Sequence, residues 1–186
     1  MKTTKILFSL WLVFLGFQAA HAQVDIKLSP FGLLFNRAVA RVEFPASQNV
    51  GVELLGGGAW NSFNFEDQGD LRFHNYHLGA NGRYYFSPDK GLDKFYLGGY
   101  AKYNGGSAKE KDSSTSLQTT RLAVGTLIGF KTLAKNEHLL FDFNVGLGRA
   151  LVYKIEGNTP DDDINLADFP ILNWDLPVLV GIGWRF

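Results

Sequence analysis

The sequence contains no cysteine, and its single methionine is the first residue. Without cysteine the chain can form neither disulfides nor thiolate metal sites. After the first 22 residues no apolar run approaches the length of about 18 residues that a membrane-spanning helix needs. An excess of one charge is also missing, because 18 basic residues oppose 18 acidic ones. This balance gives no electrostatic footprint for nucleic acid.

The first 22 residues have the features of a cleavable export signal. Two lysines near the N-terminus precede an apolar run of 12 residues, Ile6–Phe17. Ala20 and Ala22 place small residues at the two positions that a signal peptidase recognises, which predicts cleavage after Ala22. Cleavage would remove two of the 18 basic residues and leave 23–186 as one domain with a net charge of −2. Residue 23 is Gln, so a lipoprotein anchor is excluded at this site.

Along the rest of the chain, large apolar residues alternate with glycine and charged residues. Successive side chains of a strand point to opposite faces, so each predicted strand has one bulky apolar face and one polar or small face. A face of glycine and charge cannot form a dry core, but it can line a narrow lumen surrounded by lipid-facing side chains. A closed barrel also satisfies every backbone polar group inside lipid. The alternation therefore predicts an all-β fold, a closed antiparallel up-and-down transmembrane β-barrel.

We predict eight strands. The alternation directly places six of them, at 49–60, 71–87, 94–104, 117–132, 138–154 and 171–186. Two more are predicted at 24–34 and 37–45, which gives an even number with both termini on the periplasmic side. Pro30 and Gly32 interrupt the first of these, so one long bent strand followed by six remains an alternative.

Aromatic spacing and turn lengths agree with a membrane-spanning barrel. Trp174 and Trp184 share a face ten residues apart, which corresponds to about 33 Å along a strand and about 25 Å across a membrane after a tilt of roughly 40°. Outer-membrane barrels have short periplasmic turns and long outer loops. The short turns predicted here are 45–49, 87–93 and 132–136, and the longer outer stretches are 61–70, 105–114 and 156–170.

The predicted cleavage site, the alternating strand from Leu172 to Trp184 and the terminal Phe186 resemble the small eight-stranded outer-membrane barrels of the OmpA, OmpX and OmpW type. The stretch from Leu28 to Phe35, which leads into Val42-Glu43, is similar to the opening of small barrel proteins common in Bacteroidetes. The resemblance covers the whole mature chain and is architectural. It implies that Trp184 and Phe186 form an assembly signal for the outer-membrane insertion machinery, and it implies no catalytic residue.

Ten charged residues fall on the inward-facing side of the predicted strands: Arg41, Glu43, Glu53, Arg83, Lys102, Arg121, Lys131, Asp142, Asp175 and Arg185. Buried charges are stable only when they are paired and hydrogen-bonded, so we predict a mixed-sign polar network in the lumen. Eight strands leave an interior that side chains can just fill, and Tyr85, Tyr96 and Tyr100 add bulk. A structural packing role is therefore favoured over a selectivity lining for small solutes.

No catalytic, cofactor-binding or metal-binding residue is predicted. His74 and His77 are three residues apart, which places them on opposite faces of a strand where they cannot share a metal without a bulge. The acidic stretch 161–165 resembles a calcium loop, but Leu166 stands where the turn glycine is needed. We expect it to be a solvated outer loop.

The sequence favours a structural or surface-interaction role through the outer loops, in the bacterial outer membrane after export through the periplasm. A narrow channel for small or hydrophobic solutes is one alternative, and a soluble periplasmic, lipocalin-like ligand carrier is another. The expected partners are outer-membrane lipids, including lipopolysaccharide, and the insertion machinery during assembly. Nucleic acid is not expected, and the sequence identifies no extracellular partner.

Arg72 and Arg149 interrupt the apolar face near the predicted outer rim. Arginines at that height can extend to the interface and contact lipopolysaccharide phosphates. Replacing both with Ala should weaken the retention of lipopolysaccharide by the purified protein, measured by quantifying co-purified lipid. Unchanged retention would dismiss this role.

Overall fold

The structure is a computed structural model that describes residues 23–34, 36–65, 69–110, 116–157, 164–165 and 173–186. The predicted signal peptide and its cleavage site lie outside these ranges, as does most of the acidic stretch 161–165. Within the described ranges, no helix combines the length and the apolar character needed to cross a membrane.

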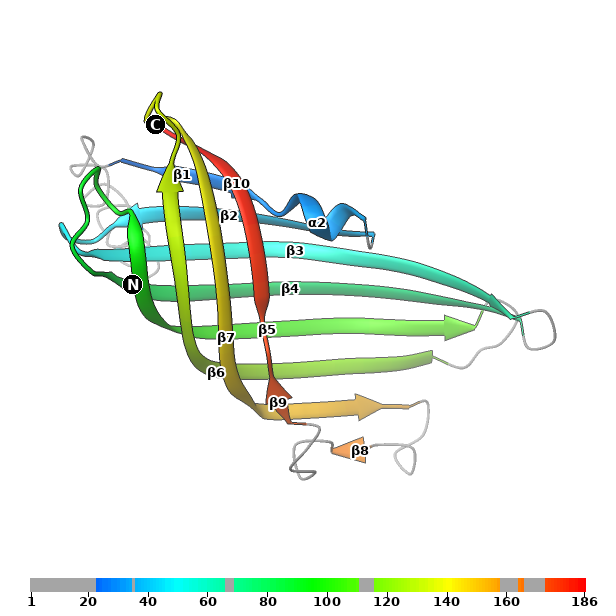
Figure 1. Cartoon of the computed structure of the whole chain (residues 1–186). Helices are drawn as coiled ribbons and strands as arrows, with labels where there is room; N and C mark the ends of the chain where they lie inside the picture. The colour runs from blue at the N-terminus through cyan, green and yellow to red at the C-terminus, as the bar shows by residue number, and fades with distance from the viewer. Residues whose placement is uncertain (1–22, 35, 66–68, 111–115, 158–163, 166–172) are drawn as a thin grey trace, which may run out of the picture.

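Eight antiparallel strands form a closed barrel in chain order (Figure 1). They are β1 (Asp25–Leu28), β2 (Arg37–Pro45), β3 (Val50–Phe65), β4 (Gly69–Tyr85), β5 (Lys94–Glu110), β6 (Ser116–Leu133), β7 (Leu139–Glu156) and β10 (Val178–Arg185). The ring closes because β10 pairs with both β7 and β1. The predicted eight-stranded up-and-down barrel is confirmed. The alternative of one bent strand over 24–44 is wrong, because helix α2 (Pro30–Leu33) separates β1 from β2.

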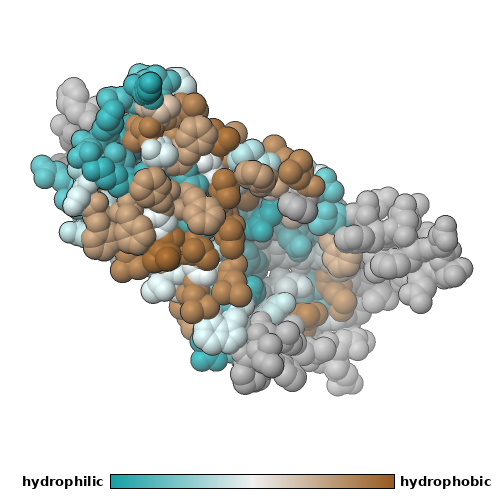
Figure 2. All heavy atoms as spheres, in the orientation of Figure 1, coloured by the Kyte–Doolittle hydropathy of each residue, from teal (hydrophilic) through white to brown (hydrophobic). Residues whose placement is uncertain are grey.

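Each strand turns its bulky apolar residues outward and its charges inward. Trp174, Val178 and Ile182 are 49%, 61% and 40% exposed, whereas Asp142 and Arg185 are 1% and 4% exposed. Figure 2 shows the apolar side chains gathered across the middle of the visible face, with hydrophilic residues at one end. A soluble lipocalin-like barrel needs the opposite arrangement, so that alternative is wrong. The outer surface suits contact with hydrocarbon.

The first strand is much shorter than the predicted 24–34. Only Asp25–Leu28 pairs as a strand, after which Pro30 begins the single turn of α2. Proline suits the first helical position because its missing N–H has no helical partner there. On the β1 side of β10, strand pairing ends at the Leu28–Ile182 pair, as far as the structure is described. Helix α2 lies beyond that point, beside β2 (Figure 1).

The predicted last strand, 171–186, is interrupted. A two-residue strand, β9 (Trp174–Asp175), precedes β10, and Leu176 and Pro177 separate them. Pro177 cannot donate to a ladder, but its carbonyl accepts a hydrogen bond from the Gly146 N–H at 2.8 Å. The chain therefore stays aligned with β7 across the break. Residues 171–172 lie outside the described ranges.

The first two predicted outer loops are largely strand. β3 reaches Phe65, β4 begins at Gly69 and β5 extends to Glu110, so the predicted loops 61–70 and 105–114 were too long. An antiparallel hairpin can continue in water with polar side chains on its faces, because pairing alone satisfies its backbone. In the third predicted outer loop, 156–170, a two-residue strand, β8 (Ile164–Asn165), pairs with β7.

The two ends of the barrel differ. The connections 46–49, 86–93 and 134–138 lie at one end together with Gln23 and Phe186, and we name it the short-turn end. The opposite end carries the extensions of β3 to β7, and we name it the long-strand end. In Figure 1 these extensions continue well beyond β10. The positions of the turns agree with the predicted ones.

Inward-facing glycines make room for large side chains from the facing wall. A Cβ at Gly129 would collide with the Tyr96 ring and the Phe143 carbonyl, whereas a Cβ at Gly82 would meet nothing within 4 Å. We expect Gly129→Ala to lower the free energy of unfolding by about 1–3 kcal/mol through overpacking. Gly82 lies on the outer face of β4. Gly82→Ala is therefore the control for the same substitution without a collision, and it should leave stability within about 0.5 kcal/mol. Urea titrations of protein in lipid vesicles measure both, and equal effects would contradict the packing explanation.

Candidate functional site

The barrel interior has two layers. The layer near the short-turn end is filled by buried charged residues, which we name the plug: Asp25, Lys27, Arg41, Glu43, Glu53, Arg83, Asp93, Lys131, Asp142 and Arg185. Five are cations and five are carboxylates, so the plug is electrically balanced. Tyr85, Leu92 and Tyr96 pack against it as part of a buried apolar cluster. The layer near the long-strand end contains a cavity.

Asp142 on β7 is surrounded by cations from the opposite wall. Its Oδ2 atom lies 3.0 Å from Lys27 Nζ and 3.0 Å from a guanidinium nitrogen of each of Arg41 and Arg83. The Tyr96 hydroxyl donates to Oδ1 at 2.6 Å. The carboxylate is 1% exposed, so these partners replace the water that it loses on burial.

Glu43 on β2 is the second centre of the plug. Its carboxylate accepts hydrogen bonds from Lys27 at 2.6 Å, from Lys131 at 2.8 Å and from the Tyr85 hydroxyl at 2.5 Å. Lys131 Nζ also lies 4.7 Å from the centroid of the Tyr85 ring, a geometry that favours cation–π attraction. Residues of β1, β2, β4 and β6 thus meet on one carboxylate.

Asp25 and Arg185 join the first and last strands. They are register partners across the β1–β10 pair, and two guanidinium nitrogens bond the carboxylate at 2.7 and 2.8 Å. Arg185 also donates to the carbonyls of Lys90 and Leu92 in the turn between β4 and β5. This pair therefore links the closing seam to the short-turn end through charge-assisted hydrogen bonds.

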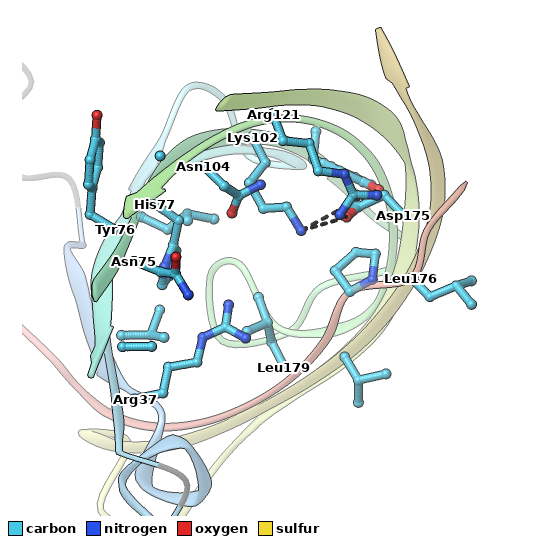
Figure 3. A pocket seen from close by; sticks show the side chains of 18 of the residues that line it. Arg37, Asn75, Tyr76, His77, Lys102, Asn104, Arg121, Asp175, Leu176 and Leu179 are labelled. Carbon is cyan, nitrogen blue, oxygen red and sulfur yellow. Dashed lines mark hydrogen bonds and ion pairs between the residues drawn. The ribbon is translucent and has the colours of Figure 1, made fainter. Parts of the chain in front are cut away.

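On the long-strand side of the plug, the Asp175 carboxylate on β9 binds three side chains. It accepts from the Tyr100 hydroxyl at 2.7 Å, from Lys102 at 2.9 Å and pairs with Arg121 at 3.0 Å. These residues line a cavity of about 590 Å³, which Figure 3 shows in close view. Arg37 and His77 approach the same cavity from β2 and β4.

No family model matches the chain, and no curated protein does either. Among solved structures, the chain is similar to a major outer membrane protein of Thermus thermophilus, with a TM-score of 0.51, 14% identity, and 89% of this chain and 99% of that chain covered. It is also similar to Ail, the attachment invasion locus protein of Yersinia pestis, with a TM-score of 0.49, 14% identity, and 89% and 97% covered. The chain has the fold of the small outer-membrane β-barrels. At this identity the likeness shows the fold alone.

All ten charged residues predicted for the lumen lie on the inner side of the barrel. Seven belong to the plug, and Lys102, Arg121 and Asp175 line the cavity. The predicted set lacked Asp25 and Lys27, which contact five of its members. The alternation that predicted the first strand also placed both of them inward, so the signal was present in the sequence.

Three of the other predicted site residues, Trp184, Phe186 and Arg149, lie on the outside of the barrel. Trp184 is 43% exposed and stacks on His138 with 5.3 Å between ring centroids. Phe186 exchanges backbone hydrogen bonds with Val24, and its role as an assembly signal stays a prediction. Arg149 is exposed beside Trp174, with 5.8 Å between the guanidinium carbon and the ring centroid. The side chain of Arg72 lies outside the described part of the structure.

The histidines are placed as predicted, on opposite faces of β4. His77 is buried and His74 is exposed. Within the described residues, no group of three His, Asp or Glu side chains could hold a metal ion. The charges of the plug neutralise one another, which is consistent with the predicted packing role.

Removing one charge from the plug should destabilise the barrel. Asp142→Asn keeps the shape but leaves Lys27, Arg41 and Arg83 undercompensated, so we expect the free energy of unfolding to fall by about 3–5 kcal/mol. Urea titration in lipid vesicles measures the loss. If the variant fails to insert, adding Arg83→Gln should recover insertion by restoring the charge balance.

Glu137→Gln provides the control at an exposed ion pair. Lys90 donates to Glu137 at 2.6 Å in the turns of the short-turn end, and this hydrogen bond lowers the pKa of the Glu137 carboxyl. Both side chains are exposed, so water screens their interaction and we expect little change in stability. Equal losses in the two variants would contradict a special role for burial.

Proposed function

We propose that this chain is a non-catalytic, non-conducting outer-membrane barrel that acts through the surface of its long-strand end. The plug is the observation that carries the proposal. Its charged side chains are almost fully buried and cross the lumen from several strands. A barrel filled in this way has no continuous aqueous path, which argues against the alternative of a narrow channel.

The long-strand end supports the surface role. β3 to β7 contain 16 to 18 residues each, whereas a strand crosses a membrane with about 9–11. Beyond the aromatic residues Tyr76 and Tyr103, outward-facing side chains become polar, as at His74 and Gln118. This change of character marks where the sheet leaves hydrocarbon and continues in water.

The proposal also gives the orientation of the barrel in the membrane. The short-turn end would face the periplasm, and export would use residues 1–22 as a signal peptide. Lipopolysaccharide would contact Arg149, whose exposed guanidinium lies near Trp174 at the wall of the barrel. The insertion machinery would read the strand that ends in Trp184 and Phe186.

Two measurements test the proposal. Purified protein in planar bilayers should show no conductance steps, because the plug blocks the lumen. Bacteria that display the protein should adhere to matrix-protein-coated surfaces, and a variant with both hairpin tips removed should not. Asn61 pairs with Phe73, and Ser107 pairs with Gln118, so an Asn-Gly turn can replace 62–72 and 108–117 without changing the register.

A variant of natural length with Gly and Ser in both tips controls for hairpin length. It should lose adhesion together with the shortened variant if side chains make the contact. Conductance by the wild type, or adhesion no greater than that of bacteria without the protein, would contradict the proposed function.

A further inference from the structure

We propose that the cavity at the long-strand end is a binding site for a small organic anion. This inference goes beyond the surface role proposed above and stands on different residues. The cavity, about 590 Å³, is within the range of about 300–1,000 Å³ that is common for small-molecule sites. The plug forms its floor, so a ligand would enter from the long-strand end.

The charges that line the cavity favour an anionic ligand. Arg37, Lys102 and Arg121 line the cavity, and Asp175 is the single carboxylate among its described lining residues. Asp175 already receives Tyr100, Lys102 and Arg121. The cavity therefore has an excess of two positive charges, in contrast to the balanced plug beneath it.

Arg37 is the cation of the cavity whose guanidinium is not hydrogen-bonded to any described residue. Its side chain makes no hydrogen bond and no ion pair within 4 Å to the described residues, and only the longer-range attraction of Asp175 acts on it. In Figure 3 this side chain points into the cavity. An arginine presents a planar fork of donors that matches a carboxylate. The guanidinium is thus available for a ligand rather than needed for the fold.

Two buried polar groups also lack partners. His77 is 5% exposed and Asn144 is 1% exposed, and neither His77 Nε2 nor Asn144 Nδ2 has a hydrogen-bond partner among the described residues. Both side chains line the cavity. Buried polar atoms without partners are costly. An anion in the cavity gives the Asn144 amide an acceptor, and it gives one to His77 in the tautomer that carries its proton on Nε2.

The cavity also has apolar walls. Val39, Leu55 and Leu127 are buried inward-facing residues that line it. They provide a surface for the hydrocarbon part of a ligand, while Arg37 and the polar side chains orient its charged group. The class that fits is a compact organic anion with an apolar body and a carboxylate or similar head.

Three probes of nearly equal shape test the charge preference: benzoate, benzamide and benzamidine. Titration calorimetry uses the full mature protein in phosphatidylcholine nanodiscs, with empty nanodiscs as the blank. We expect benzoate to bind, benzamide to bind roughly tenfold or more weakly, as for the loss of one charge-assisted hydrogen bond, and benzamidine not to bind. Absence of benzoate binding, or equal affinity for benzamide, overturns the proposal.

Two substitutions of Arg37 test whether the anion binds in this cavity. Arg37→Gln should weaken benzoate binding by roughly tenfold or more, and Arg37→Glu should abolish it. Lys154→Gln removes an exposed cation of β7 that does not line the cavity, and it should leave the affinity unchanged. Because the Arg37 side chain has no hydrogen bond to a described residue to lose, both Arg37 variants should fold, which far-ultraviolet circular dichroism and protease resistance check. Unchanged affinity in Arg37→Gln overturns the assignment.

Discussion

An eight-stranded barrel encloses so little space that side chains from opposite walls meet at its axis. Every inward residue must therefore fit the residues facing it in both volume and charge. Gly129 leaves room for Tyr96, and Tyr96 in turn donates to Asp142. The balanced plug follows from this constraint, because a charge that cannot reach water must find an opposite charge within the lumen.

The closing seam depends on the same network. β1 offers only four residues to β10, yet Asp25 and Arg185 bind each other there and Lys131 adds a second cation to Asp25 at 2.7 Å. Side-chain ion pairs thus reinforce a short backbone ladder between the chain's two ends. Past Leu28, helix α2 replaces strand pairing along β10, so the wall of the barrel is not uniform around its circumference.

The two layers of the lumen differ in how their side chains fill the interior. Near the short-turn end, charged side chains fill the interior and join strands of opposite walls through ion pairs. Toward the long-strand end the side chains no longer fill the interior, and the partners of Asp175 leave room above the plug. A closed floor under an open, positively charged cavity suits retention of a ligand better than its transport. The extended strands around it carry the surface to which we assign the proposed function.

Alternation along the chain was enough to predict the barrel, its eight strands and the inward position of charges such as Glu43 and Asp142, because a strand has only two faces. It could not predict which charges meet. Lys27 and Asp142 are 115 residues apart, and only closure of the ring places them 3.0 Å from each other. The predicted loop boundaries were wrong because they followed local polarity, whereas cross-strand pairing extends β3 to β5 through polar residues. The cavity likewise arises from side chains on several strands, which no local pattern encodes.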